Sequence, residues 1–168
     1  LQAATSKYKI NTWVRSASAA LISDFSERVR INPEVAGTSF ASSGVESSSA
    51  YALSSTWATQ QADNLAITQN CETSVCTPAE RAAFDLLVWR QLVRAKMPQG
   101  AAHIEGNLRN GFLVTMMWLD KENYDEDKVL QAAPVCSGNE TGMAQQSCCP
   151  QAVSAPDGVR CTRFSFVP

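Results

Sequence analysis

The sequence lacks the residues that most enzymes depend on. It holds a single histidine, His103, among 168 residues, so a Ser-His-Asp triad could form only around that side chain. It has neither a G-x-S-x-G nucleophile elbow nor a glycine-rich phosphate-binding loop. We therefore expect a non-catalytic protein with no cofactor, and we interpret His103 as a hydrogen-bonded structural residue within a strand.

Long apolar runs and strong net charge are missing as well. No apolar stretch approaches the roughly 18 residues that a transmembrane helix requires. The net charge is −2 and charged residues make up 18% of the chain, which gives no basic surface for a nucleic acid. We expect no nucleic-acid partner.

Acidic residues are concentrated in one segment, residues 120–127. Its five acids are Asp120, Glu122, Asp125, Glu126 and Asp127. Carboxylates this close could bind calcium, yet an EF-hand loop would need a glycine at its sharp turn and a closing glutamate, and both are missing. We interpret the segment as a solvated acidic loop, with calcium binding left open and no metal site predicted.

Cysteine, by contrast, is present in an even number. The six cysteines are Cys71, Cys76, Cys136, Cys148, Cys149 and Cys161. This pattern indicates disulfides and an oxidising compartment, with free thiols or a zinc site as the alternatives. Adjacent cysteines strain a bridge between themselves. We therefore predict a Cys71–Cys76 bridge, with Cys136 and Cys161 each paired to one of the adjacent two.

Two helices are predicted from periodicity and end signals. Apolar residues recur at steps of three and four through residues 1–32, and Pro33 ends that helix. The apolar stripe consists of Ile10, Val14, Ala17, Leu21, Phe25 and Val29. A second helix over residues 78–96 begins at Thr77-Pro78-Ala79-Glu80, which is the arrangement of a capping box with proline at the first helical position.

The rest of the chain changes to strand periodicity. Residues 101–107 and 112–119 are predicted strands joined by a hairpin at Asn110-Gly111. Further strands are expected at residues 160–167 and, short, at 51–55. Residues 120–159 are predicted to form a long loop that the cysteines hold in place. The expected fold class is α+β, in one domain with a helix over 1–32 and a globular head over 33–168.

Three stretches together resemble the PilV family, the minor pilins of bacterial type IV pili. Residues 71–100 follow its pattern C-x4-C-[ST]-P, then [FY]-D-x3-W within a helix, then P-x-G. Residues 21–34 resemble its D-x2-E-R-x-R-x-N-P run, and residues 112–120 its V-T-V-x-W-x-D strand. The matching positions include Cys71, Cys76, Thr77, Pro78, Asp85, Trp89, Pro98, Gly100, Asp24, Glu27, Arg28, Arg30, Asn32, Pro33, Val114, Thr115, Trp118 and Asp120.

The resemblance implies a pilin-like fold, with the N-terminal helix packed on an antiparallel sheet. It implies a non-catalytic subunit that joins other minor pilins of the FimU, PilW, PilX and PilE types in a tip complex. That complex would prime assembly of the major pilin and present a tip adhesin. Leu1 would lie just beyond an apolar half-helix that anchors the subunit in the inner membrane before assembly, and the head would then be periplasmic or extracellular.

The resemblance also assigns roles along the first helix. Val14, Leu21, Phe25 and Val29 would hold the helix to the sheet. The candidates for contact with neighbouring subunits are Trp13, Arg15 and Ile31. Residues 136–161 match no part of the pattern. The alternatives are a minor pseudopilin of type II secretion, similar to GspI, and a free secreted binding module stabilised by disulfides.

Overall fold

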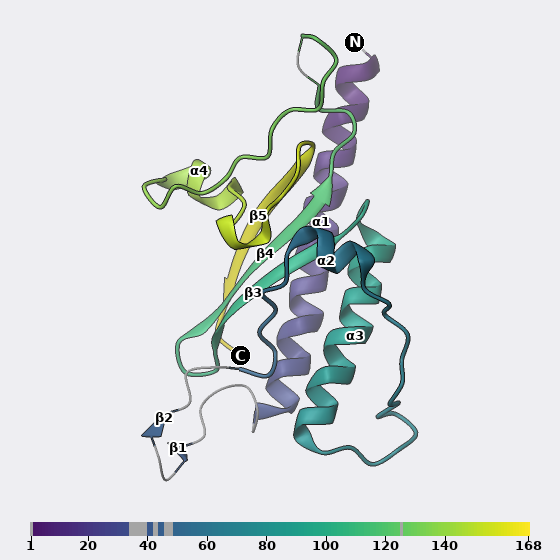
Figure 1. Ribbon diagram of the computed structural model, residues 1–168, viewed down its shortest axis with the longest axis vertical. Coiled ribbons are helices and arrows are strands. Elements are labelled where there is room, and N and C mark those ends of the chain that lie inside the picture. Colours follow the sequence, from purple (N-terminus) through teal and green to yellow (C-terminus); the bar gives the residue numbers. More distant parts are fainter. Residues whose placement is uncertain (1, 34–39, 42–43, 46–48, 125) are drawn as a thin grey trace.

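The computed structural model (Figure 1) is an α+β arrangement of four helices and a three-stranded antiparallel sheet. It describes residues 2–33, 40–41, 44–45, 49–124 and 126–168, and the side chains of α1 from Thr12 onward. The elements are α1 (Gln2–Ile31), β1 (Phe40–Ala41), β2 (Gly44–Val45), α2 (Trp57–Ala62), α3 (Pro78–Lys96), β3 (Ala101–Asn107), β4 (Gly111–Leu119), α4 (Gly142–Ser147), the 3-10 turn η2 (Gln151–Val153) and β5 (Val159–Phe166).

The sheet has the strand order β3-β4-β5, and its two faces bury different residues. Alternate residues of a strand point to opposite faces. On the first face, β4 residues such as Phe112 and Val114 pack with α1 and α3 in one core. On the second face, Met117 packs with Cys149, Cys161 and the 3-10 turn. No helix in the described part of the chain is long and apolar enough to cross a membrane.

Helix α1 supplies the centre of the first core. It has 30 residues and runs along the length of the molecule (Figure 1). Val14, Leu21, Phe25 and Val29 are all buried as predicted, whereas Ala17 of the predicted stripe is half-buried. The side chain of Ile10, also predicted for this stripe, lies outside those that the structure describes.

Phe25 has four aromatic neighbours. Its ring centroid lies 4.8 Å from that of Trp89 and 5.9 Å from that of Tyr51, and it makes edge contacts with Phe112 and Phe166 of the sheet. Edge-to-face pairs of this kind add to the free energy of burial. One side chain of α1 therefore contacts α3, β4 and β5.

Helix α3 begins and ends as predicted. Thr77 and Glu80 form the reciprocal capping box, with the Thr77 backbone N–H donating to the Glu80 carboxylate at 2.7 Å. Past the C-terminal end, a Cβ added to Gly100 would lie 2.4 Å from the carbonyl oxygen of Val93. The chain turns tightly from α3 into β3 here, and only glycine leaves room for that approach.

The predicted strand at residues 51–55 is wrong. Leu53 makes a single antiparallel bridge with Ile104, and α2 follows at once, with Thr56 as its N-cap. Next along the edge of β3, the side-chain amide of Gln60 replaces a neighbouring strand. It donates to the Ala102 carbonyl at 2.8 Å and accepts from the Ala102 N–H at 3.2 Å.

Residues 120–159 were predicted to form one long loop, but the described part of this segment contains the helix α4 and a 3-10 turn. The hairpin of β3 and β4 and the final strand β5 are confirmed.

The disulfides are Cys71–Cys76, Cys136–Cys148 and Cys149–Cys161. The predicted pairing is thus confirmed, and the structure resolves which of the adjacent cysteines takes which partner.

Candidate functional site

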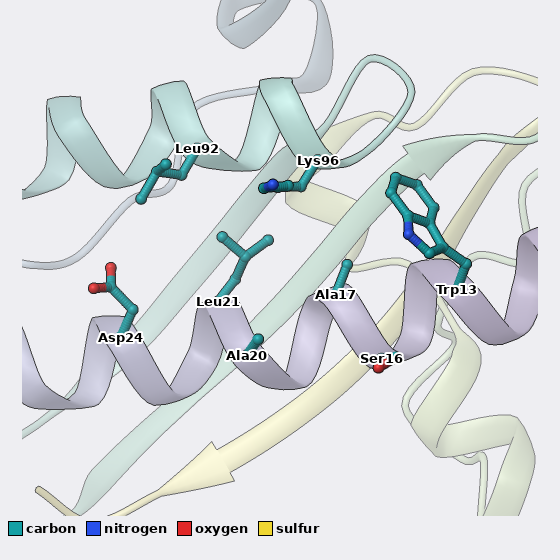
Figure 2. Close-up of a pocket in the computed structure, with 8 residues that line it drawn as sticks. All are labelled: Trp13, Ser16, Ala17, Ala20, Leu21, Asp24, Leu92 and Lys96. Atoms are coloured by element: carbon teal, nitrogen blue, oxygen red, sulfur yellow. The ribbon is translucent and has the colours of Figure 1, made fainter.

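A groove between α1 and α3 is the candidate contact surface of the molecule. It has a volume of about 440 Å³ and opens to solvent along one flank of α1. Its lining residues are Trp13, Ser16, Ala17, Ala20, Leu21, Asp24, Leu92 and Lys96. Figure 2 shows Trp13 at one end and Asp24 toward the other, with the α3 residues facing them.

The chemistry of the groove suits an apolar helix. Leu21 is buried at its base, and Ser16, Ala17 and Ala20 present small side chains beside it. Small side chains allow close approach, and amphipathic helices commonly bind in apolar grooves of this kind. Lys96 adds a positive charge toward the Trp13 end and Asp24 a negative charge at the opposite end.

Trp13 and Ile31 are both exposed, with 52% and 72% of their surfaces accessible. They are 18 residues apart, which is five turns of helix or about 27 Å, so they lie on the same flank of α1. Arg15 is exposed too, but a two-residue step turns it to the opposite flank. The structure therefore groups two of the three predicted contact residues and separates the third.

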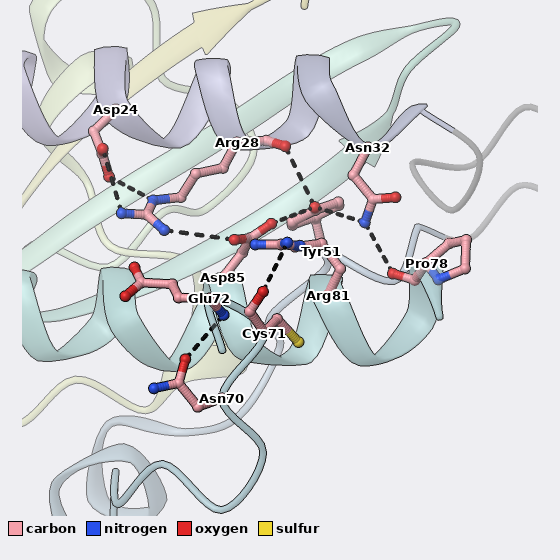
Figure 3. A network of polar contacts seen from close by, with 10 residues as sticks. All are labelled: Asp24, Arg28, Asn32, Tyr51, Asn70, Cys71, Glu72, Pro78, Arg81 and Asp85. Atoms are coloured by element: carbon pink, nitrogen blue, oxygen red, sulfur yellow. Dashed lines mark hydrogen bonds and ion pairs between the residues drawn. The ribbon is translucent and has the colours of Figure 1, made fainter. Parts of the chain in front are cut away.

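A partly buried polar network, which begins at Asp24 of the groove, joins α1 to α3 (Figure 3). Arg28 donates to Asp24 at 2.7 Å and lies 3.5 Å from the carboxylate of Asp85. The Tyr51 hydroxyl donates to the other Asp85 oxygen at 2.8 Å. The Asn32 amide donates to Tyr51 at 3.0 Å and to the Pro78 carbonyl at 2.9 Å.

Asp85 is the buried charge at the centre of this network. It is 2% exposed, and burial raises the pKa of its carboxyl, although the Tyr51 hydrogen bond and the positive charge of Arg28 oppose that rise. Burial likewise raises the pKa of Tyr51, so this hydroxyl stays a hydrogen-bond donor. Removing one partner of such a network would leave another buried and unsatisfied. The network therefore holds the two helices in one relative position.

Sequence reasoning missed this network. It identified the Asp24 and Arg28 pair, which the structure confirms, but assigned no role to Asp85. The signal was an acid within the apolar face of α3, next to the buried Phe84. The α3 side of the groove, Leu92 and Lys96, was also missed, because only the tertiary fold brings it to α1.

The other predicted site residues stay apart from the groove. His103 is buried in β3 as expected, but its Nδ1 has no hydrogen-bond partner among the described residues and its Nε2 lies 3.6 Å from Glu105. The predicted hydrogen bonding of His103 is therefore not met. Asp125 of the acidic segment lies outside the described residues. Within the described part, no group of three or more acidic, histidine or cysteine side chains could hold a metal ion.

The network joins the two helices that line the groove. Comparisons with known proteins match the chain to no family model, no curated protein and no solved structure. The resemblance to the PilV family therefore rests on the three sequence stretches, without a relative to support or oppose it.

Proposed function

We propose that the chain is the globular part of a minor pilin of the PilV type, a non-catalytic subunit of a type IV pilus tip complex. Its partners would be other minor pilins, the major pilin and a tip adhesin. We also propose that the fold is pilin-like, and the packing of α1 on one face of an antiparallel sheet supports this.

One observation carries the proposal. Asp24, Arg28, Asn32, Pro78 and Asp85 come from two of the sequence stretches that resemble the family, and they meet in a single buried network. Residues matched only by sequence pattern thus share a physical role. That role, fixing α1 to α3, also shapes the groove that we assign to subunit contact.

The proposed occupant of the groove is an amphipathic helix of a neighbouring subunit. Its apolar stripe would cover Leu21, Ala17 and Ala20, with Trp13 closing one end. Charge complementarity calls for an acidic side chain next to Lys96, whereas Asp24 is already paired with Arg28. A helix of about 18 residues would have the length to follow this flank of α1 from Trp13 to Ile31.

The first test is the coding sequence upstream of Leu1. The proposal expects roughly 25 to 30 residues of apolar helix, preceded by a short basic leader that ends in glycine. A cleavable secretory signal joined directly to Leu1 would contradict it and would favour a free secreted binding module.

The second test is Trp13→Asp, expressed in a host strain that lacks the wild-type chain. We expect surface pili to be lost while the purified variant keeps the wild-type melting temperature, because Trp13 is half exposed. Val75→Asp is the matched control, since Val75 is 99% exposed and lies far along the chain in the small cysteine loop. Normal piliation in the Trp13 variant would refute the assignment of the groove to subunit contact.

A further inference from the structure

The three disulfides have different surroundings. Cys149 and Cys161 are both buried in the second core. In each of the other two bridges, one cysteine is buried and one, Cys76 or Cys136, is half-buried. A reductant can therefore reach the Cys71–Cys76 and Cys136–Cys148 bridges more easily than the third, and accessible bridges are the exchangeable ones.

The two accessible bridges differ in charge. The Sγ of Cys76 accepts only a long contact of 3.7 Å from the neutral amide of Gln69. The Sγ of Cys136 accepts from the guanidinium of Arg163 at 2.9 Å. Arg81 lies near the Cys71–Cys76 bridge, but it donates to the Cys71 carbonyl at 3.0 Å and not to a sulfur. A cation in contact with a cysteine sulfur stabilises its thiolate, so reduction would gain a direct ion pair at Cys136.

Among the described residues, the guanidinium of Arg163 has no charged partner in the oxidised protein. Its Nε–H is buried without a hydrogen-bond partner, and among the described residues no carboxylate lies within ion-pair distance of it. A disulfide sulfur is a weak acceptor, and a half-buried charge is stabilised most by an opposite charge. Reduction of Cys136 supplies that charge.

Opening this bridge disturbs little packing. The bridge closes a lobe, residues 137–147, whose helix α4 has no buried residue. Cys149, next in the chain, stays tied to β5 through Cys161. Release of the lobe would therefore leave the second core in place.

We propose that Cys136–Cys148 is a site of reversible thiol–disulfide exchange with a dithiol reductant, and that Arg163 makes it the first of the three bridges to open. A reductant thiolate attacks one sulfur of the bridge, forming a mixed disulfide and releasing the other cysteine. The second reductant thiol then closes the reductant's own disulfide. Two electrons pass to the bridge, Cys136 is left as a thiolate beside Arg163, and Cys148 takes the proton of the second reductant thiol. The only proton that goes to water is the one that the attacking thiol lost when it ionised.

The test uses the folded, fully oxidised chain and defined ratios of reduced to oxidised dithiothreitol. Samples are quenched with acid, alkylated and read by peptide mass spectrometry. We expect Cys136 and Cys148 to be alkylated first, Cys71 and Cys76 next, and Cys149 and Cys161 last. The exchange constant of Cys136–Cys148 with dithiothreitol should exceed that of Cys71–Cys76 about tenfold, which corresponds to a difference of about 30 mV in reduction potential.

Variants isolate the role of the charge. Arg163→Gln should remove the preference, and Arg163→Lys should restore most of it. The matched control is Arg160→Gln on the same strand, because Arg160 donates to the Ala132 carbonyl and to no sulfur. The preference should persist in that control.

Three outcomes would overturn the proposal: equal opening of the Cys136–Cys148 and Cys71–Cys76 bridges, an unchanged preference in Arg163→Gln, or reduction of all three bridges only when the chain unfolds. Circular dichroism of each sample before reduction separates a folding defect from an effect on exchange. This proposal does not depend on the pilus function, because the test uses the isolated chain without a partner.

Discussion

The two faces of the sheet are stabilised by different means. The first is covered by the two long helices α1 and α3, and Phe25 of α1 contacts Trp89 of α3 and Phe166 of β5. The second is covered by an irregular segment with one six-residue helix, α4, that buries none of its residues. One disulfide, Cys136–Cys148, lies within that segment, and a second, Cys149–Cys161, ties it to β5. Where regular structure supplies little apolar burial, covalent bonds supply the constraint.

We expect that shortening an apolar side chain lowers the free energy of unfolding most on the first face. Phe25→Ala removes the side chain that joins α1, α3 and the sheet, and core Phe→Ala changes typically cost about 3–5 kcal/mol. Urea denaturation would measure this loss in the free energy of unfolding. Val153→Ala, in the second core, is the comparison and should cost less, because a smaller side chain is removed. Equal losses at the two sites would contradict the distinction.

Loss of the buried bridge should be the largest effect on the second face. In the entropic model, replacing Cys149 and Cys161 together by serine costs about 3 kcal/mol for a loop of this size. The same double change at Cys71 and Cys76 should cost roughly 0.7 kcal/mol less, because that loop is shorter. Thermal and urea unfolding of both double variants provide the measurement. A greater loss at the short loop would show that the loop model does not govern these bridges.

A smaller effect is expected at the start of α3. Thr77→Ala removes the hydroxyl that accepts from the Glu80 N–H, and loss of such a cap typically costs about 1 kcal/mol. Thr77→Ser should retain nearly all of the stability because it keeps the oxygen. If the serine variant were as unstable as the alanine variant, the methyl group rather than the cap would be responsible.

The smallest effect concerns how the first face responds to pH. Because the pKa of Asp85 is raised above its ordinary value of 3.8, the folded state binds more protons than the unfolded state in the window above that value. The contribution of Asp85 to stability is therefore greatest below pH 3.8 and falls as the pH rises through the raised pKa. Asp85→Asn should lack this decline, as urea titrations across the window would show. The same slope in both proteins would place the titrating group elsewhere.

Local signals made α1, α3 and the hairpin predictable, whereas the short helices α2 and α4 were not predicted. A proline after Asn32 and the capping box at Thr77 mark ends in the sequence itself, and the buried stripe of α1 repeats at the helical period. The strand at 51–55 failed because Gln60, several residues later, takes the hydrogen bonds that a strand would have made. The α3 side of the groove and the Arg163 contact with Cys136 join residues far apart in sequence, so no local pattern could indicate them.

The side chain of Gln60 also limits how the molecule can associate. An unpaired outer strand can recruit a strand from another molecule, which leads to sheet extension and aggregation. At β3, Gln60 and Leu53 already occupy the backbone groups of Ala102 and Ile104 that such a strand would need. Contact with other chains through an intermolecular β-sheet is therefore blocked over those residues of the β3 edge.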